Sequence, residues 1–179
     1  MIKANESLLV VVDCQERMMP AIYKGDELVE KIGKLVRGCR ILDIPILIAQ
    51  QYTKGLGDTV AGIKEALGKF EHIEKMAFSC CGEPAFLARL KEANRKSIIV
   101  CGVEAHVCVL QTVCDLLNDG YDVYLAADCI GSRFETDRAY AERRMMHHGA
   151  VLTTMESVLF ELLVSADHPK RKEISSLVK

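Results

Sequence analysis

Residues 98–109 read IIVCGVEAHVCV, and this stretch decides the fold of the chain. The apolar run 98–101 predicts a strand that is buried on both faces, which is typical of a parallel sheet. We expect Gly102 to end the strand, and from Ala105 onward the apolar residues follow the period of a helix. Cys108 therefore falls in the first turn of a helix that directly follows a central strand.

This position of Cys108 is typical of a nucleophile. The partial positive charge of a helix N-terminus lowers the pKa of a nearby thiol, so we expect Cys108 to lose its proton easily. The alternative is a buried cysteine that behaves as a small apolar residue, and this is the better interpretation if no partner residues exist. The choice between the two depends on the rest of the chain.

Apolar runs alternate with amphipathic stretches over the whole sequence, which indicates a parallel sheet with helices on both faces. The predicted strands are 7–12, 46–49, 72–75, 98–101, 121–127 and 150–153. Helices are predicted at 26–42 (with Asp26 as N-cap), 59–67, 85–93, 105–119, 137–148, 156–165 and 170–177. We therefore predict one domain over 1–179, a three-layer α/β/α sandwich with a six-stranded parallel sheet and a C-terminal helical tail over 170–179.

Composition limits the possible partners. A net charge of -2 gives no basic surface for nucleic acid or for an anionic membrane. The eight cysteines lie mostly in apolar runs or in the adjacent pair at 80–81, without the spacing of a zinc site. We find no signal peptide and no apolar stretch long enough to span a membrane. The expectation is a cytoplasmic protein with a small-molecule substrate and with neither a nucleic-acid nor a membrane partner.

Polar residues follow several of the predicted strands, at the edge of the sheet where ligands bind in open α/β folds. They are Asp13, residues 50–52, Lys75, residues 102–104 and Asp128. Taken singly, Asp13 could be a turn residue and Lys75 a solvated surface lysine. Together with Cys108 they supply a base, a positive charge that stabilises a thiolate, and a nucleophile. This combination favours a catalytic site.

Several other chemistries do not fit the sequence. A cysteine-dependent phosphatase needs an arginine in the loop after its cysteine, and residues 109–114 contain none. There is no P-loop, and the glycines of the loop 55–57 do not follow a strand directly, as a dinucleotide-binding turn requires. Residues 147–148, both histidine, fall in the last turn of a helix, where they suit the helix dipole. His106 is interpreted as a wall of the pocket and not as a base.

Three blocks of the sequence resemble the signatures of the isochorismatase-like cysteine hydrolases, a family with a Rossmann-like α/β fold. They are LVVVDCQ at 9–15, EKMAFS at 74–79 and CGVEAHVCV at 101–109. The resemblance extends from about residue 7 to residue 165, with the three blocks in the family's order and spacing. The loop QYTKGLG at 51–57 is most similar to the branch of isochorismatase domain-containing protein 2.

The resemblance implies a role for each matching residue. Cys108 would be the nucleophile, Asp13 the general base and Lys75 the group that positions both charges. A cis peptide bond is implied between Val103 and Glu104, and the backbone N–H groups of Glu104 and Cys108 would form the oxyanion hole. The expected substrate pocket is drawn from Met18, Gln51, Tyr52, Phe78 and His106.

The sequence departs from one part of the family. Nicotinamidases of this family hold a metal with an Asp and two His after the second strand, whereas residues 50–53 read QQYT here. We therefore expect no metal and no cofactor. A cysteine nucleophile favours an amide, a carbamate or a similar C–N bond over the vinyl ether of isochorismate. The resulting prediction is a metal-independent cysteine hydrolase that works through a thioester-type intermediate.

Two alternative functions stay open. The chain could be a non-catalytic scaffold on the same fold, or a thiol redox sensor in which Cys101 or Cys114 approaches Cys108 in space. Family resemblance also implies a homo-oligomer, either a dimer or a tetramer.

Overall fold

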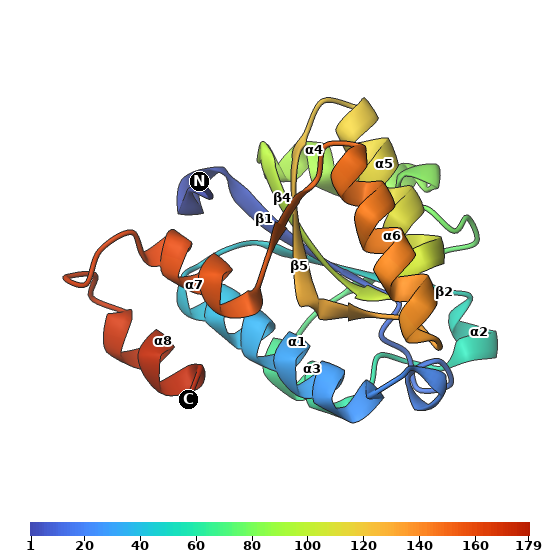
Figure 1. Ribbon diagram of the computed structural model, residues 1–179, viewed down its shortest axis with the longest axis horizontal. Coiled ribbons are helices and arrows are strands. Elements are labelled where there is room, and N and C mark those ends of the chain that lie inside the picture. The colour runs from blue at the N-terminus through green and yellow to red at the C-terminus, as the bar shows by residue number, and fades with distance from the viewer.

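A six-stranded sheet forms the centre of the molecule, between two layers of helices (Figure 1). The computed structural model describes all 179 residues. The strands are β1 (Ser7–Val12), β2 (Ile46–Gln51), β3 (His72–Lys75), β4 (Ser97–Val103), β5 (Asp122–Gly131) and β6 (Val151–Thr153). They are all parallel and lie in the order β3-β2-β1-β4-β5-β6. The predicted fold class is confirmed.

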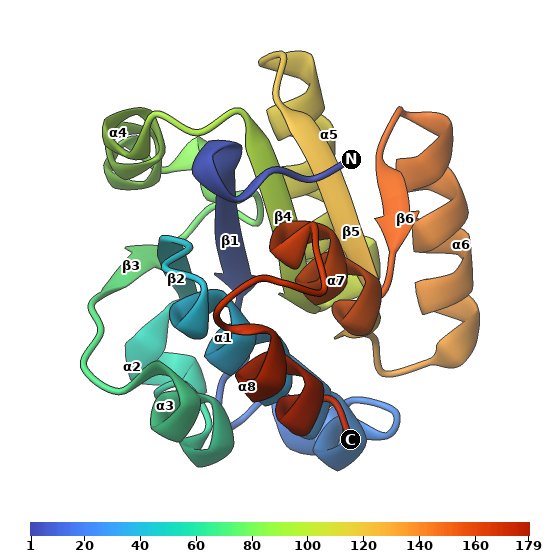
Figure 2. The same cartoon turned by 90° about the vertical axis from the view of Figure 1, so that its left-hand side faces the viewer.

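The two faces of the sheet are covered by different helices (Figures 1 and 2). One face carries α1 (Gly25–Ile41), α3 (Ala61–Leu67), α7 (Met155–Leu163) and α8 (Arg171–Leu177), and the other α4 (Pro84–Ala93), α5 (Leu110–Asn118) and α6 (Glu135–His147). The short segments are η1 (Ala4–Glu6), η2 (Met19–Ala21), α2 (Thr53–Leu56), η3 (Cys80–Gly82) and the π-helical η4 (Ala105–Val109).

Each face of the sheet has its own apolar core. In β4, Ile99 and Cys101 point into the core under α1 and α7, whereas Ile98 and Val100 point into the core under α4, α5 and α6. A strand with apolar neighbours on both sides has no polar face, and this explains why the central strands read as continuous apolar runs.

Three strands are longer than the sequence predicts. β2 continues through Gln50 to Gln51, so these two residues lie in the strand and not after it. β4 continues through Gly102 to Val103, and β5 continues to Gly131 with a register shift against β4. Asp128 therefore lies inside β5, and its predicted position at a strand end is wrong. Its carboxylate pairs with Lys31 of α1 at 3.3 Å and accepts a hydrogen bond from the backbone N–H of Met155 at the start of α7, at 2.8 Å.

Most helix ends shift by one or two residues from the prediction, and three further differences concern the helices themselves. Helix α1 begins at Gly25 with no side-chain cap, so Asp26 is a first-turn residue and not the N-cap. Its negative charge still suits the helix dipole there. The short helix α2 forms inside the stretch 51–57, which we predicted as a loop. Cys108 lies near the start of a helix, as predicted, but the first turn is π-helical and α5 follows from Leu110.

Candidate active site

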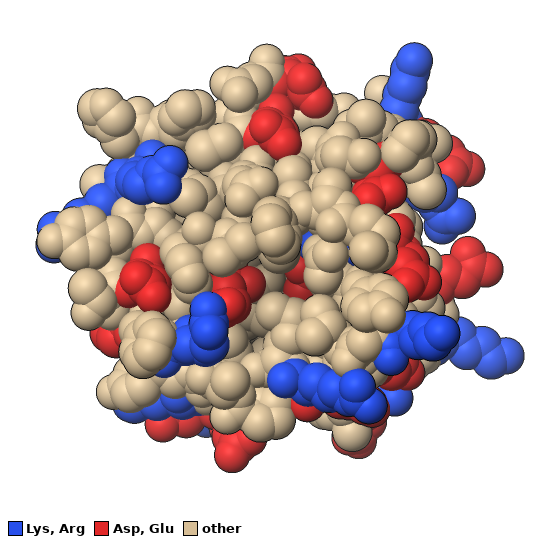
Figure 3. All heavy atoms as spheres, turned by 90° about the vertical axis from the view of Figure 1, so that its right-hand side faces the viewer, with Lys and Arg blue, Asp and Glu red and all other residues tan.

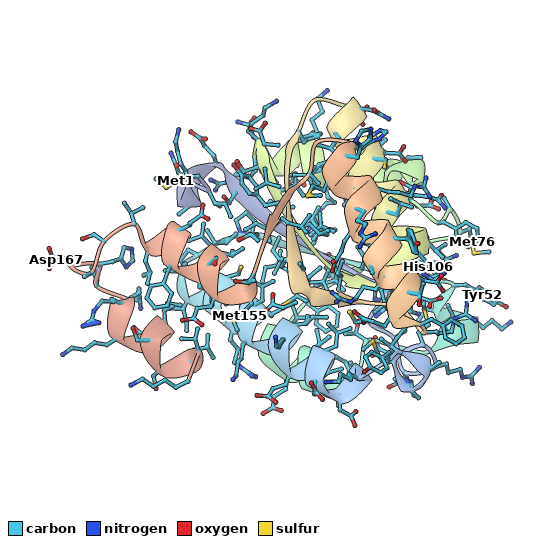
Figure 4. The ribbon with its side chains drawn as sticks, viewed as in Figure 1. Met1, Tyr52, Met76, His106, Met155 and Asp167 are labelled. Carbon is cyan, nitrogen blue, oxygen red and sulfur yellow. The ribbon has the colours of Figure 1, made fainter.

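The site lies where the strand order reverses, between β1 and β4, at the carboxyl ends of the strands. Asp13 directly follows β1, Lys75 is the last residue of β3, and Cys108 lies in η4 just after β4. Figure 4 shows Tyr52, Met76 and His106 together at this end of the molecule. Figure 3 looks onto the same end, where uncharged side chains cover much of the middle.

Asp13 and Lys75 form a fully buried ion pair. The distance from Lys75 Nζ to Asp13 Oδ2 is 2.7 Å, and both side chains are 0% exposed. Apart from this pair, neither carboxylate oxygen of Asp13 has a hydrogen bond of normal geometry within the protein. A buried carboxylate with free acceptor capacity can take up a proton from a neighbouring group.

The Lys75 ammonium is surrounded by oxygen atoms. Besides Asp13, it donates to Gln51 Oε1 at 2.6 Å, to the carbonyl of Phe78 at 2.9 Å and to that of Ala77 at 3.2 Å. An ammonium has three N–H donors, so these acceptors use all of them. Burial lowers the pKa of Lys75, but Asp13 outweighs it and the net pKa is raised. Lys75 is therefore a fixed positive charge with no proton to spare for a substrate.

Cys108 lies against this ion pair and is almost fully buried, with 4% of its surface exposed. Burial raises the pKa of its thiol to about 12, and the negative charge of Asp13 adds to this effect while Lys75 opposes it. The expectation that the pKa of this thiol is lowered is wrong, because desolvation and the nearby carboxylate of Asp13 raise it. Cys108 rests as a neutral thiol and needs a base when it attacks.

Asp13 is suited to be that base. Burial raises the pKa of its carboxyl above the usual range, while Lys75 and the Cys108 thiol act in the opposite direction. Its backbone adopts the left-handed conformation, with φ at 52°, which ends β1 and turns the side chain toward Lys75. Aspartate tolerates this conformation better than most residues.

The peptide bond between Val103 and Glu104 is cis. The Glu104 side chain pairs with Arg133, whose backbone N–H and Nε donate to Oε2 at 3.0 and 3.1 Å. This pair ties the segment before η4 to the chain after β5. Glu104 is the N-cap of η4 and Cys108 lies within it, and their backbone N–H groups are the ones that the family resemblance assigns to an oxyanion hole.

The five expected pocket residues have different environments. The side chain of Gln51 binds Lys75 directly, so it belongs to the ion-pair cluster. Tyr52 and Phe78 are 45% and 56% exposed and flank the site, with Met18 half-buried in the chain before η2. His106 is half-buried, and its Nδ1 is 3.0 Å from the Ser132 hydroxyl oxygen.

Sequence reasoning missed two residues that shape the site. Gln15 is fully buried and its side chain binds the backbone of Gln51, although its residue type gives no sign of this. Gly102 has φ at +120°, and a Cβ there would lie 2.1 Å from the carbonyl oxygen of Val12. Only glycine lets β4 approach β1 so closely. The sequence shows that Gly102 follows an apolar run, but it does not show that the backbone of Val12 lies against this residue.

The structure contains no group of three or more His, Cys, Asp or Glu side chains arranged to hold a metal ion. The family resemblance predicts that residues 50–53 take the place of a nicotinamidase's metal ligands. Gln50 instead donates from Nε2 to Asp58 at 2.7 Å and to Thr59 at 2.9 Å. A hollow of about 1210 Å³ lies beside β2, β3 and α4, and its lining includes none of Asp13, Lys75 and Cys108. No helix is long and apolar enough to cross a membrane.

Comparison with known proteins gives consistent matches. Residues 7–157 match the family described as "Isochorismatase domain". Isochorismatase domain-containing protein 2 of Danio rerio is 38% identical over 172 residues, which cover 96% of this chain and 86% of that protein.

Solved structures agree with these matches. The structure described as MAR1 ribonuclease from Caenorhabditis elegans superimposes with a TM-score of 0.93 at 40% identity, covering 99% of this chain and 91% of that one. YcaC from Escherichia coli, described as an octameric hydrolase of unknown specificity, has a TM-score of 0.88 at 23% identity, covering 98% of this chain and 86% of that one. The similarity to YcaC supports the fold alone.

Proposed function

Because this chain belongs to the isochorismatase family, we propose that it is a metal-independent cysteine hydrolase of small amides, carbamates or similar C–N compounds. The observation that carries the proposal is the buried Asp13–Lys75 pair beside the Cys108 thiol. The carboxylate has free acceptor capacity, the ammonium has none to spare as a donor, and the thiol needs a base. Each group can therefore perform one distinct task.

In the first half of the reaction Cys108 is acylated. Asp13 accepts the thiol proton as the sulfur attacks the carbonyl carbon, and Lys75 offsets the negative charge that collects on the sulfur. The backbone N–H groups of Glu104 and Cys108 donate to the oxyanion of the tetrahedral intermediate. The C–N bond then breaks, the amine leaves with the proton from Asp13, and a thioester on Cys108 remains.

In the second half water releases the acid. Asp13 takes a proton from the attacking water, the oxyanion forms again, and the C–S bond breaks. The proton on Asp13 returns to the sulfur of Cys108. Atoms and charges balance without a metal or a cofactor, and Asp13 carries the proton in both halves.

The test is to incubate the protein with a panel of small amides and carbamates and to follow its intact mass. We expect an acyl adduct that maps to Cys108, and loss of both adduct and turnover in Cys108→Ala. Asp13→Asn should slow acylation about 10²–10⁴-fold, the usual contribution of a general base. Turnover that persists in Cys108→Ala would refute the proposal.

RNA belongs in the same panel, because the similar protein of Caenorhabditis elegans is described as a ribonuclease. RNA cleavage that depends on Cys108, with no amide hydrolysed, would replace the proposed substrate class. A complete lack of adducts and turnover would favour the scaffold function.

In the redox-sensor alternative, Cys101 is no longer a candidate for the resolving cysteine. Cys101 points into the core under α1, on the opposite face of the sheet from Cys108, and cannot serve as the resolving cysteine without unfolding. All eight cysteines are free thiols.

A further inference from the structure

Next to Asp13, a side chain replaces main-chain hydrogen bonds of the sheet, and the site depends on this replacement. Strand β1 leaves β2 at Asp13, whose backbone N–H makes the last main-chain bond to β2, at the carbonyl of Ala49. Beyond it, the side-chain amide of Gln15 takes over. Its Oε1 accepts from the N–H of Gln51 at 2.8 Å, and its Nε2 donates to the carbonyl of Gln51 at 2.9 Å. A side chain thus makes the two hydrogen bonds that a neighbouring strand would have made.

The Gln51 side chain is held from both ends of its amide group. Its Nε2 donates to the carbonyl of Met76 at 3.0 Å, so the amide is oriented with its oxygen toward Lys75. The distance from Lys75 Nζ to Gln51 Oε1 is 2.6 Å, shorter than the contacts of Nζ with the carbonyls of Ala77 and Phe78. The backbone and the side chain of Gln51 are thus both fixed by hydrogen bonds that do not involve Lys75.

We propose that Gln51, held by Gln15, is a positioning residue that keeps the Lys75 ammonium between Asp13 and Cys108. The proposal rests on the proposed function, since it assigns a task within the same cluster. The backbone of Gln51 hydrogen-bonds Asp13, whereas its side-chain oxygen binds Lys75, and it is through Lys75 that the side chain acts. An uncharged acceptor is the right group for this task, because a carboxylate at the same place would compete with Asp13 for the ammonium.

The measurable consequence is the reactivity of Cys108. Lys75 lowers the pKa of this thiol, so an ammonium that is less well placed leaves the thiolate less stable. Well below the pKa of a thiol, its alkylation rate falls tenfold for each unit by which that pKa rises. The rate of alkylation of Cys108 therefore reports the position of Lys75, whether or not a substrate is known.

The chain offers a matched control in the preceding residue. Gln50 is fully buried, whereas Gln51 is half-buried, and Gln50 likewise makes side-chain hydrogen bonds, with Asp58, Thr59 and Thr53, but does not contact Lys75. The variants Gln51→Met and Gln50→Met each replace a hydrogen-bonded amide with an apolar side chain of similar length. A loss that is merely structural should appear in both.

The experiment compares the parent protein with Gln51→Met, Gln51→Glu and Gln50→Met. Each is treated with iodoacetamide at about pH 8, and the modification of Cys108 is followed by peptide mass mapping. Cys114, whose environment involves Arg144 and Asp115 and not Lys75, is the internal reference in each digest. Circular dichroism checks that all four proteins are folded.

We expect Gln51→Met to slow alkylation of Cys108 about 3- to 10-fold relative to Cys114, because a hydrogen bond to a charged group is lost. Gln51→Glu should slow it further, since a second carboxylate draws the ammonium from Asp13 and adds negative charge. Gln50→Met should match the parent protein. Equal rates in all four proteins, or equal slowing in Gln51→Met and Gln50→Met, would overturn the proposal.

These results separate the two proposals. If no substrate acylates Cys108 in the parent protein, the proposed function fails while the order of alkylation rates still tests Gln51. If acylation occurs and the alkylation rates do not follow the expected order, the function stands and the role of Gln51 is wrong.

Discussion

The buried ion pair allows stability and catalysis to be separated with two substitutions. Asp13→Asn keeps the shape of the side chain but leaves the Lys75 ammonium without its carboxylate partner. Both side chains are 0% exposed, so water cannot compensate, and breaking such a pair costs about 3–5 kcal/mol in unfolding free energy. For a protein of 179 residues this corresponds to a fall in Tm of about 6–20 °C.

Lys75→Met should lose stability in a manner that depends on pH. Burial raises the pKa of Asp13, and without Lys75 only hydrogen bonds from Cys108 and from the backbone of Gln51 oppose this effect, so the folded-state pKa rises further. A carboxyl with a raised folded-state pKa binds its proton more tightly in the folded protein. Its stabilising contribution is complete below the unfolded value of about 3.9 and is lost as pH rises through the folded value. Lys75→Met should therefore be closer to the parent protein at about pH 5 than at about pH 8.

The double variant Asp13→Asn, Lys75→Met is the decisive member of the set. It removes both charges and leaves two uncharged side chains of similar size, so most of the lost stability should return. Activity should not return, because the base is still missing. Urea unfolding followed by circular dichroism at both pH values, together with turnover of any substrate found, measures all four proteins. Single variants within about 1 kcal/mol of the parent would refute a buried, coupled pair.

Three other predictions test separate features. Gly102→Ala should lower the free energy of unfolding in urea by at least about 3 kcal/mol, since the new Cβ would lie 2.1 Å from the Val12 carbonyl oxygen. Gly120→Ala, at φ +86° with nothing within 4 Å, should lower it by about 1 kcal/mol. Hydrogen bonds from Lys64 and Gln50 lower the pKa of Asp58 to about 2, so stability should fall as pH drops from about 4 to about 2. Asp58→Asn should show a smaller fall, with Glu83 and Glu135, whose pKa values are also lowered, accounting for the rest. Removal of metals with a chelator should leave turnover unchanged, and activity that returns with added zinc would contradict this.

The sequence predicts the fold because local patterns determine most of it. Apolar runs identify the strands, and the rule that parallel strands end at one edge places Asp13, Lys75 and Cys108 together. The sequence does not correctly predict the pKa of the Cys108 thiol. The helix dipole is a local property and can be read from sequence, whereas burial and the charge of Asp13 come from segments far away in the chain. The wrong position of Asp128 has a similar cause, since the extension of β5 depends on its pairing with β4.

The place where the strand order reverses is irregular in three ways, and each serves the site. Asp13 turns out of the sheet in a left-handed conformation, which directs its carboxylate to Lys75. This turn removes the strand that would have held Gln51, and the Gln15 amide replaces it. Gly102 lets β4 pass close to the last residue of β1, so that η4 begins beside Asp13. A regular sheet would satisfy its own backbone and leave the carboxylate, the ammonium and the thiol apart. The irregular backbone is thus the physical condition for a base, a fixed charge and a nucleophile to meet in one buried place.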